Sequence, residues 1–504
     1  MEKRALGLET EFGCMVKDDS LGLPEELVQV IKNHAFLERG LGLIDLHARD
    51  YAFEPARSGG FLVNGGRLYV DAVGDHEEYA TPECIDWEDV VAYDKAGQRL
   101  LVSLLDDLGL TGRVAFYNNN VDHFGGHTFG CHENYAVSLD FHFFSRAVEA
   151  LLPFLVTRQI FAGSGRVGGH RINPTSLPRD MSGRSRFETD YLWIDDLYGV
   201  ENDPSVHFQI SQRADHIVKA VSTRVRFNRA IINPKRDALG SGTGFDRLHL
   251  LFGESNCSEY AGWLKVATTS IVLDLIEAQA VPAQARIMHP VRTLRQISHD
   301  ATWRWIVLLA DGSSMPAVDL QRLYLAAAKD RLSGRNAQTD RALAEWEKVL
   351  DGLERDPLSL ADRLDWAAKF KLFCEFAPGR AGGRKPEAKG ACRRAEDFPT
   401  PDDLLYSLDV EYHNIDPAQG LYYGLQEAGK LQRISSESAI QKAMFEPPSN
   451  TRACGRAEAV KRLLRRRSRS YAVDWDLIWL GKDACLPLPD PHNTYLAEVE
   501  EFLS

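Results

Sequence analysis

The sequence predicts an α+β protein, in which helices and strands both build the fold, and three observations support this. Several segments alternate apolar and polar residues, the pattern of half-buried strands. Others repeat apolar residues every three or four positions, the pattern of amphipathic helices. The chain of 504 residues is 44% hydrophobic and 26% charged, which is typical of a folded globular protein. This length fits roughly two to four average domains, or one large domain and one small one.

The predicted strands begin near the N-terminus. In residues 3–14, Glu9 and Glu11 fall on one face, and apolar residues and a threonine fall on the other. Another strand is predicted after the glycine- and histidine-rich turn that ends near residue 130. Further strands are expected at residues 61–71, 113–118, 206–210, 229–233 and 247–253.

The predicted helices alternate with these strands. Asp86 is a suitable N-cap for a helix that Gly109 ends. Other helices are expected near residues 25–37, 144–161, 259–279, 316–332 and 339–354. Residues 40–60 are predicted to be loop-rich, and residues 166–203 to form a polar loop that is long for a compact domain.

A segment rich in glycine, proline, alanine and charge, residues 377–401, predicts a linker. We therefore expect a catalytic domain over residues 1–395 and a small C-terminal domain over residues 396–504. Within the latter, the basic run KRLLRRRSRS is expected to be a solvated helix face.

Composition narrows the class of protein. The net charge of −13 argues against a general nucleic-acid binder, which needs a basic surface. The N-terminus lacks the apolar region of a signal peptide, and no run of about 18 apolar residues predicts a membrane span. The eight cysteines are scattered without a CxxC pair, which indicates reduced thiols. We expect a cytoplasmic enzyme without nucleic-acid or membrane partners.

Glu9 and Glu11 are the first candidate site. Two carboxylates on one strand face repel each other and raise each other's pKa. A divalent cation removes this repulsion, and magnesium prefers such oxygen ligands. The alternative is a pair of exposed glutamates on an edge strand.

The stretch NGGRLYVDAVGDHEEYATPE is the second. Alternation places Arg67, Tyr69 and Asp71 on one face, and Glu78 returns after a short loop. A guanidinium holds phosphate by two hydrogen bonds, and a carboxylate can act as base or nucleophile. The alternative is an Arg–Asp salt bridge on a half-buried sheet.

Basic side chains elsewhere complete the pattern. His132, in GCHENY, is suited to a metal or a phosphate, although a lone histidine is more often structural. Arg213, Arg247 and His249 could neutralise a triphosphate, or form ordinary salt bridges. The sequence has no Walker A loop, no GxGxxG after a strand and no GxSxG motif. Together these features favour an enzyme that uses ATP with magnesium and activates a carboxylate as an acyl phosphate.

The motifs also resemble those of a known family. LGLETEFG, NGGRLYVD, HEEYATPEC, NNNVDHFGGHTFGCHENY, ISQRADHI, RLHLLFGESN, EPPSNTRA and VDWDLIWL are similar to motifs of the Pup ligase and depupylase family, from near residue 5 to near residue 480. This family is related to glutamine synthetase. The resemblance implies a glutamine-synthetase-like large domain, whose curved antiparallel sheet cradles ATP and Mg²⁺, and a small C-terminal domain.

The resemblance also implies roles for single residues. Matched motif to motif, Glu9, Tyr69 and Glu78 would bind magnesium, and Asp71 would be the catalytic aspartate. Glu11 and His132 join the metal ligands on a weaker, general similarity. The nucleotide-contacting positions would be Arg67, Thr81 and Trp475, with His249 added on the same general grounds. Arg213 and Arg247 join this set only as basic residues suited to a triphosphate.

A ligase of this family would phosphorylate the C-terminal glutamate of Pup and join it to a substrate lysine, which marks the target for the proteasome. A depupylase would cleave that bond, or deamidate a C-terminal glutamine, with nucleotide as cofactor. The ligase is favoured by ETEFG, GCHENY and GESNCSE, while GSGRVG and YATPEC resemble the depupylase.

Two departures from the family leave the modifier and partner open. The chain has IINPKRDALGSGTG where the family has an acidic, histidine-containing stretch, and it carries the segment 166–203. The remaining alternatives are a small-molecule glutamate–amine ligase and a nucleotide-dependent binding module without catalysis.

Overall fold

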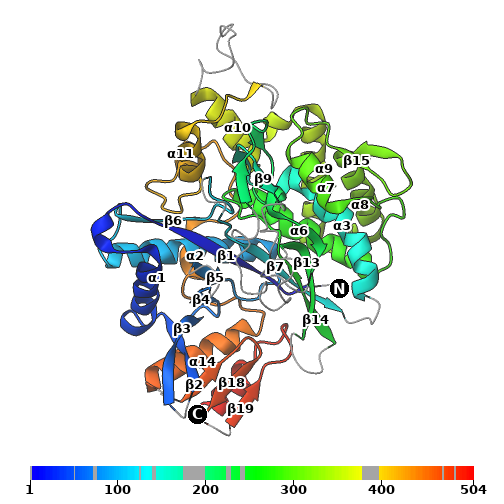
Figure 1. The fold of residues 1–504 in the computed structure, drawn as a ribbon. Coiled ribbons are helices and arrows are strands. Elements are labelled where there is room, and N and C mark those ends of the chain that lie inside the picture. The colour runs from blue at the N-terminus through cyan, green and yellow to red at the C-terminus, as the bar shows by residue number, and fades with distance from the viewer. Residues whose placement is uncertain are drawn as a thin grey trace, which may run out of the picture.

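A ten-stranded sheet forms the centre of the molecule (Figure 1). The computed structural model describes residues 3–49, 52–71, 76–123, 127–138, 143–173, 199–222, 229–238, 244–376, 397–467, 470–481 and 484–504. The strand order is β12-β13-β14-β7-β1-β5-β4-β3-β2, and β6 pairs with β1. The strands are β1 (Leu6–Val16), β2 (Gly42–Arg49), β3 (Ala52–Leu62), β4 (Arg67–Val70), β5 (Glu77–Ala80), β6 (Val114–Tyr117), β7 (Cys131–Ser138), β12 (Lys219–Val221), β13 (Ala230–Ala238) and β14 (Phe245–Leu250).

The pairing in this sheet is antiparallel except between β12 and β13. Along β1, β4 and β14, buried and half-buried residues alternate. Successive side chains of a strand point to opposite faces, so one face of the sheet packs on the core and the other stays partly open. The open face is therefore where polar residues such as Glu9 and Glu11 lie.

Helices cover the buried face. Contacts join α1 (Pro24–Asn33) and α2 (Trp87–Asp107) to β1, and α3 (Phe143–Ala162) and α6 (Glu259–Glu277) to β13 and β7. The other α-helices among the described residues are α7 (Pro290–Ser298), α8 (Ala317–Leu332), α9 (Ala337–Arg355), α10 (Asp365–Phe376), α11 (Asp403–Tyr412), α12 (Leu421–Glu427), α13 (Glu437–Ala443), α14 (Ala453–Arg466) and α15 (Leu496–Phe502). The α+β class predicted from the sequence is confirmed.

Most predicted elements lie where the patterns indicated. Asp86 is the N-cap position of α2, although its side chain makes no capping hydrogen bond. The helix ends at Asp107, and Gly109 follows with a φ of +64°. The predicted strand over residues 61–71 is shorter than expected, because residues 63–66 form a turn and β4 begins at Arg67.

The loop-rich assignment of residues 40–60 is wrong, because this segment forms the antiparallel hairpin of β2 and β3. Its glycines serve close packing. A Cβ at Gly60 would lie 1.9 Å from the Leu43 carbonyl oxygen, and a Cβ at Gly59 would lie 2.2 Å from that of Leu68. Gly59 also has a φ of +140°, which side chains rarely adopt. Composition alone makes such glycines look like loop residues.

The polar segment 166–203 is partly ordered into short strands. β8 (Arg166–Val167) pairs with β11 (Phe208–Gln209), and β9 (His170–Asn173) pairs with β10 (Gly199–Asn202). Residues 174–198 lie outside the described residues, as do residues 377–396 of the predicted linker. Cys374 is disulfide-bonded, so the expectation of reduced thiols throughout is wrong at this position.

Two hydrophobic clusters stabilise the fold. The larger lies between the sheet and its helices and includes residues from Leu6 to Met444, among them Leu405 and Ile440 of α11 and α13. The second joins Leu43 and Phe61 to residues 459–503. Here α14, α15 and a three-stranded sheet of β17 (Tyr471–Val473), β18 (Leu477–Leu480) and β19 (Ala484–Pro487) pack beside β2 and β3 (Figure 1). The division near residue 395 stays a prediction, because packing does not test which part folds alone.

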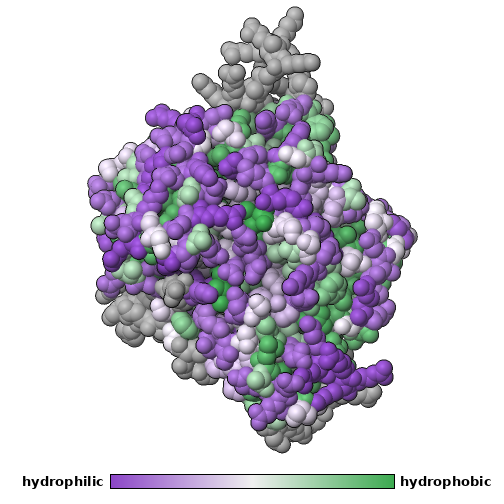
Figure 2. Space-filling model, turned by 180° about the vertical axis from the view of Figure 1, so that it is seen from behind, coloured by the Kyte–Doolittle hydropathy of each residue, from purple (hydrophilic) through white to green (hydrophobic). Residues whose placement is uncertain are grey.

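The surface matches the polar composition. The face in Figure 2 is mainly hydrophilic, with apolar residues in small scattered groups. No helix in the part of the chain that the structure describes is long and apolar enough to cross a membrane.

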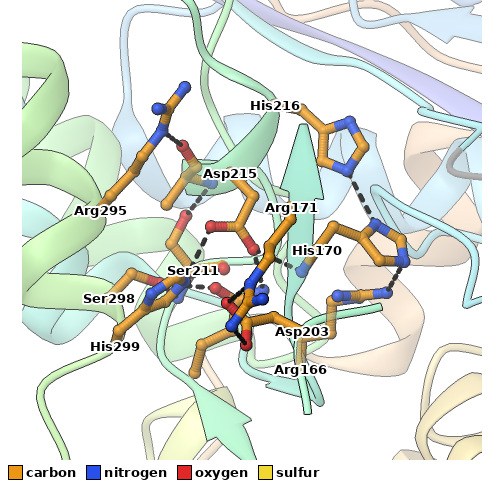
Figure 3. Close-up of polar contacts among 12 residues, drawn as sticks. Arg166, His170, Arg171, Asp203, Ser211, Asp215, His216, Arg295, Ser298 and His299 are labelled. Atoms are coloured by element: carbon orange, nitrogen blue, oxygen red, sulfur yellow. Dashed lines mark hydrogen bonds and ion pairs between the residues drawn. The ribbon is translucent and has the colours of Figure 1, made fainter. Parts of the chain in front are cut away.

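A cluster of buried histidines joins the paired strands β9 and β10 to the short helix at Ala214–His216 (Figure 3). Arg166 donates to Nε2 of His170 at 2.7 Å, and Nδ1 of His170 lies 3.0 Å from Nε2 of His216. Asp215 accepts from the backbone amide of His170 at 2.9 Å and pairs with His299 at 2.7 Å. Burial, reinforced by Arg166, lowers the pKa of His170 to about 4. Burial also holds the pKa of His216 well below its usual value, so both rings are neutral in the fold.

This cluster makes stability sensitive to acid. Between pH 6.5 and about 4, an unfolded His170 takes up a proton and the folded one does not, so the free energy of unfolding falls as the pH falls. The contribution is at most about 1.4 kcal/mol per pH unit for each such histidine. We expect His170→Gln to unfold with a shallower pH dependence than the wild type in urea titrations between pH 7 and 5. A slope in this variant equal to that of the wild type would contradict this account.

Candidate active site

The sheet register brings the predicted carboxylates together on the open face. Glu11 of β1 pairs in register with Glu78 of β5, and Glu78 pairs with Tyr69 of β4. On the other side of β1, Glu9 pairs with His132 of β7. Because directly opposite residues of neighbouring strands point to the same face, these side chains form two neighbouring polar rows on that face, one with Glu9 and His132 and the next with Glu11, Glu78 and Tyr69.

Glu9 is held by a ring of donors. Its carboxylate lies 3.2 Å from Nδ1 of His132 and accepts from the Asn134 amide at 3.0 Å. His249 and Arg247 of β14 approach it at 3.7 and 3.6 Å. Burial alone would raise the pKa of Glu9, but these cationic and hydrogen-bonding neighbours outweigh it and hold that pKa below its usual range. Glu9 is therefore a fixed negative charge.

The surroundings shift the pKa values of Glu11 and Glu78 in opposite directions. The Gly130 amide donates to Glu11 at 2.6 Å, and His76 lies 3.5 Å away; against the effect of burial, these contacts lower the pKa of Glu11 to about 2. Burial, followed by the charges of Glu11 and Glu9, raises the pKa of Glu78 well above its usual value. Burial and Glu78 likewise raise the pKa of Tyr69. The Glu78 carboxyl thus keeps its proton unless a cation binds beside the three carboxyl groups.

The donor set fits a divalent cation. Two overlapping groups place their ligand atoms within 4.8 Å of one another: Glu9, His132 and His249, and Glu11, Glu78 and His132. Carboxylate oxygens with a nearby phenol suit magnesium, which also keeps several waters. The alternative of exposed edge-strand glutamates is wrong for Glu9 and Glu11, since β1 lies inside the sheet and both are enclosed by neighbours.

Asp71 and Arg67 lie on the same face at β4. The Asp71 amide donates to the His76 carbonyl at 2.9 Å, just beyond the end of the strand, and Asp71 is half-buried. Arg67 forms an ion pair with Asp45 of β2, and its guanidinium lies 5.1 Å from the centre of the Tyr69 ring. The hairpin at residues 42–62 thus supplies the partner of this arginine.

A cavity of about 320 Å³ opens beside Glu9, on the side away from the row of Glu11, Glu78 and Tyr69. Its walls include Gly7, Glu9 and Arg247 from the large sheet, Thr81 just after β5, and Trp475 from the turn between β17 and β18. The Thr81 hydroxyl accepts from the Leu8 amide at 3.0 Å, which fixes that wall. The cavity therefore lies between the large sheet and the C-terminal part of the fold, and its assignment as the nucleotide pocket stays a prediction.

Arg213 is the predicted residue that the structure places least directly in the site. It is buried next to the short helix at Ala214–His216, and its guanidinium donates to the Leu251 carbonyl at 2.9 Å. It still contributes to the field at Glu11, since each group stabilises the charge of the other. Its role in phosphate binding stays a prediction.

Sequence reasoning missed several residues of the site. Asn134, two residues after His132, could have been found from the same strand phase. Glu83 had no assigned role, and the arginines that bind it, Arg452 and Arg456, lie about 370 positions further along the chain. No local pattern links such distant residues.

Removal of the Glu78 carboxylate tests the cation site. Since the pKa of Glu78 is raised in the fold, the metal-free protein binds more protons than the unfolded chain and loses stability as the pH rises. Glu78→Gln should therefore be more stable than the wild type at pH 8 without metal, yet bind Mn²⁺ at least ~10-fold more weakly by calorimetry.

Glu77→Gln is the matched control. Glu77 is fully buried, has a raised pKa, and pairs in register with Val70 and Phe12 on the helix-covered face. This variant should leave Mn²⁺ affinity as in the wild type. Equal loss of Mn²⁺ affinity in the two variants would contradict a cation site at Glu78.

Comparison with known proteins identifies the family. Residues 4–479 match the family described as "Pup-ligase protein". A Pup–protein ligase of Nocardioides sp. is 35% identical over 523 residues, which cover 100% of this chain and 99% of the relative. That of Kribbella flavida is 34% identical over 525 residues and covers both chains completely, 100% of each.

Two solved structures are similar over most of the chain. The ligase PafA in complex with the prokaryotic ubiquitin-like protein Pup has a TM-score of 0.76 and 26% identity, covering 100% of this chain and 91% of that one. PafA in complex with ADP has a TM-score of 0.72 and 28% identity, covering 89% and 90%. These comparisons confirm the resemblance seen in the sequence motifs, and they favour the ligase over the depupylase. The chain belongs to the Pup ligase family.

Proposed function

We propose that this protein is an ATP-dependent ligase that joins the C-terminal glutamate of a Pup-like modifier to substrate lysines by an isopeptide bond. The main observation behind this proposal is the order in which the cavity, the carboxylates and Asp71 lie along the strands. The row of Glu9, beside the cavity, is followed by the row of Glu11, Glu78 and Tyr69, and then by Asp71 opposite His76. Each row lies two residues, or roughly 7 Å, beyond the last.

This order matches the path of the reaction. A nucleotide in the cavity would direct its phosphates along the row of carboxylates, toward Asp71. Arg67 and Arg247, on the same face, would bind phosphate oxygens. Thr81 and Trp475 would contact the rest of the nucleotide. The magnesium ligands would be Glu9, Glu11, Tyr69, Glu78 and His132, and His249 and Arg213 would add positive charge.

The chemistry has two steps. The γ-carboxylate of the modifier's terminal glutamate attacks the γ-phosphorus of ATP, which releases ADP and leaves a γ-glutamyl phosphate. Asp71 then takes a proton from the lysine ammonium, the amine attacks the acyl carbon, and phosphate leaves. Magnesium, when bound, would neutralise the phosphate charge. Arg67 must exchange Asp45 for phosphate, or bind phosphate while keeping that pair.

The partners follow from this reaction. They are a Pup-like modifier, lysine-bearing target proteins and, indirectly, the proteasome that degrades them. Support comes from the solved relatives, one of which is a complex with Pup and another a complex with ADP. We place the reaction in the cytoplasm, where ATP and such targets occur together. The side chains of IINPKRDALGSGTG after Asn233 lie outside the described residues, so the choice of modifier rests on the relatives.

Asp71→Asn separates chemistry from binding. The variant keeps the size of the side chain and loses its basicity, so it should bind ADP with wild-type affinity by calorimetry. Isopeptide formation should fall by at least ~100-fold, measured as conjugate on a gel and as ADP released from ATP with a modifier ending in glutamate and a lysine-bearing protein.

Asp311→Asn is the control, because Asp311 caps Ser313 in an exposed turn far along the chain from the site. It should retain full activity. Loss of ADP binding in Asp71→Asn would make Asp71 a structural or metal residue. Cleavage of conjugates with a non-hydrolysable ATP analogue, without conjugate formation, would instead establish a depupylase. Turnover of free glutamate with small amines would establish a small-molecule ligase.

A further inference from the structure

Glu83 lies where the large sheet meets the C-terminal strands, at the wall of the cavity. It lies three residues after the end of β5, next to the bridge between Leu6 and Cys84. Neither the proposed reaction nor the cation site uses it. Its carboxylate nevertheless gathers two buried arginines of the segment around α14, Arg452 and Arg456.

The Glu83 carboxylate accepts hydrogen bonds from two buried arginines. Arg452 donates from Nε to Glu83 at 2.7 Å, and Arg456 donates to the same carboxylate from Nη1 at 3.1 Å and from Nη2. Both arginine side chains are almost completely buried, with 2% and 0% exposure. Against the effect of burial, the two guanidinium groups lower the pKa of Glu83 to about 2, so the carboxylate is charged at any physiological pH.

Arg456, which Glu83 holds in place, in turn contacts Trp475. Its Nη1 donates to the Trp475 carbonyl at 2.8 Å, and its guanidinium lies 4.8 Å from the centre of the Trp475 ring. Its Nε and Nη2 donate to the Gly65 carbonyl at 3.0 and 2.8 Å, in the turn before β4. The rings of Phe61 and Trp475 are nearly perpendicular, and their centres lie 5.0 Å apart.

We propose that Glu83 is a positioning residue for the nucleotide: through Arg456 it fixes Trp475 at the cavity wall, and so sets the affinity for ATP and ADP. This inference rests on the proposed function. An indole ring that is already fixed in one orientation can stack on an aromatic base without losing further conformational entropy when the nucleotide binds. A mobile Trp475 would lose that entropy on binding, and the affinity would be lower.

The charge of Glu83 is needed for this role, beyond its size. Without it, the two buried guanidinium groups would lose the carboxylate that both of them bind, and their mutual repulsion would displace Arg456 from the Trp475 carbonyl. Glu83→Gln therefore removes the anchor while keeping the shape of the side chain. Arg456→Lys removes the forked geometry while keeping the charge.

Calorimetric titration with ADP and steady-state kinetics test this inference. Glu83→Gln and Arg456→Lys should each bind ADP roughly tenfold more weakly than the wild type. The KM for ATP should rise by a similar factor, while the KM for the modifier stays unchanged and kcat changes by less than about twofold. Trp475→Ala should lose ADP affinity to the same extent, and Glu83→Gln should add little to it.

Glu437→Gln is the matched control. Glu437 binds Arg99 through both oxygens, at 3.0 and 3.3 Å, and joins α13 to α2 outside the cavity. It should leave ADP affinity unchanged even where it lowers the melting temperature. A fall in ADP affinity in this variant equal to that in Glu83→Gln would make the effect one of general stability and overturn the inference.

Two further outcomes separate the two proposals. Wild-type ADP affinity in a folded Glu83→Gln and in Arg456→Lys would overturn the role of Glu83 alone. Full additivity of Glu83→Gln with Trp475→Ala would also overturn it. Failure of the wild-type protein to bind ADP would overturn both this inference and the ligase.

Discussion

The pairing of β1 with β5 and β7 is the constraint on which the rest of the structure depends. It places Glu9, Glu11 and Glu78 on one face of the sheet, within reach of a shared ligand group. Like charges held this closely destabilise a fold unless something compensates them. The protein compensates with His132, Arg247 and the Gly130 amide, and leaves Glu78 protonated.

The same strand pairing sets the order in which the parts of the site lie along the sheet. Because neighbouring strands are antiparallel and in register, residues two positions apart on β1 match residues two positions apart on β4 and β5. The cavity, the carboxylates and Asp71 therefore follow one another along the strands. The buried side of the sheet, with Phe12, Leu68 and Val70 packed against helices, gives the open side its rigidity.

Part of this arrangement could be predicted from the sequence, because strand alternation is a local property. The pairing of faces in residues 6–12 and 67–71 followed from period two, and the helices near residues 259–279, 316–332 and 339–354 from their apolar repeats. The β2–β3 hairpin could not be predicted in this way. Its glycines allow close backbone contacts between strands, which composition does not distinguish from the freedom of a loop.

The sequence by itself determined the α+β class, the family, and which side chains share a strand face, since these depend on periodicity and on motifs a few residues long. Only the tertiary structure decided that Arg67 pairs with Asp45, that Glu9 lies among four donors, and that Glu83 joins Arg456 and Trp475. The physical reason is distance along the chain. Hydrogen bonds and ion pairs act over a few ångströms in space, and residues 83 and 456 come within that range only after the sheet and the C-terminal strands have packed together.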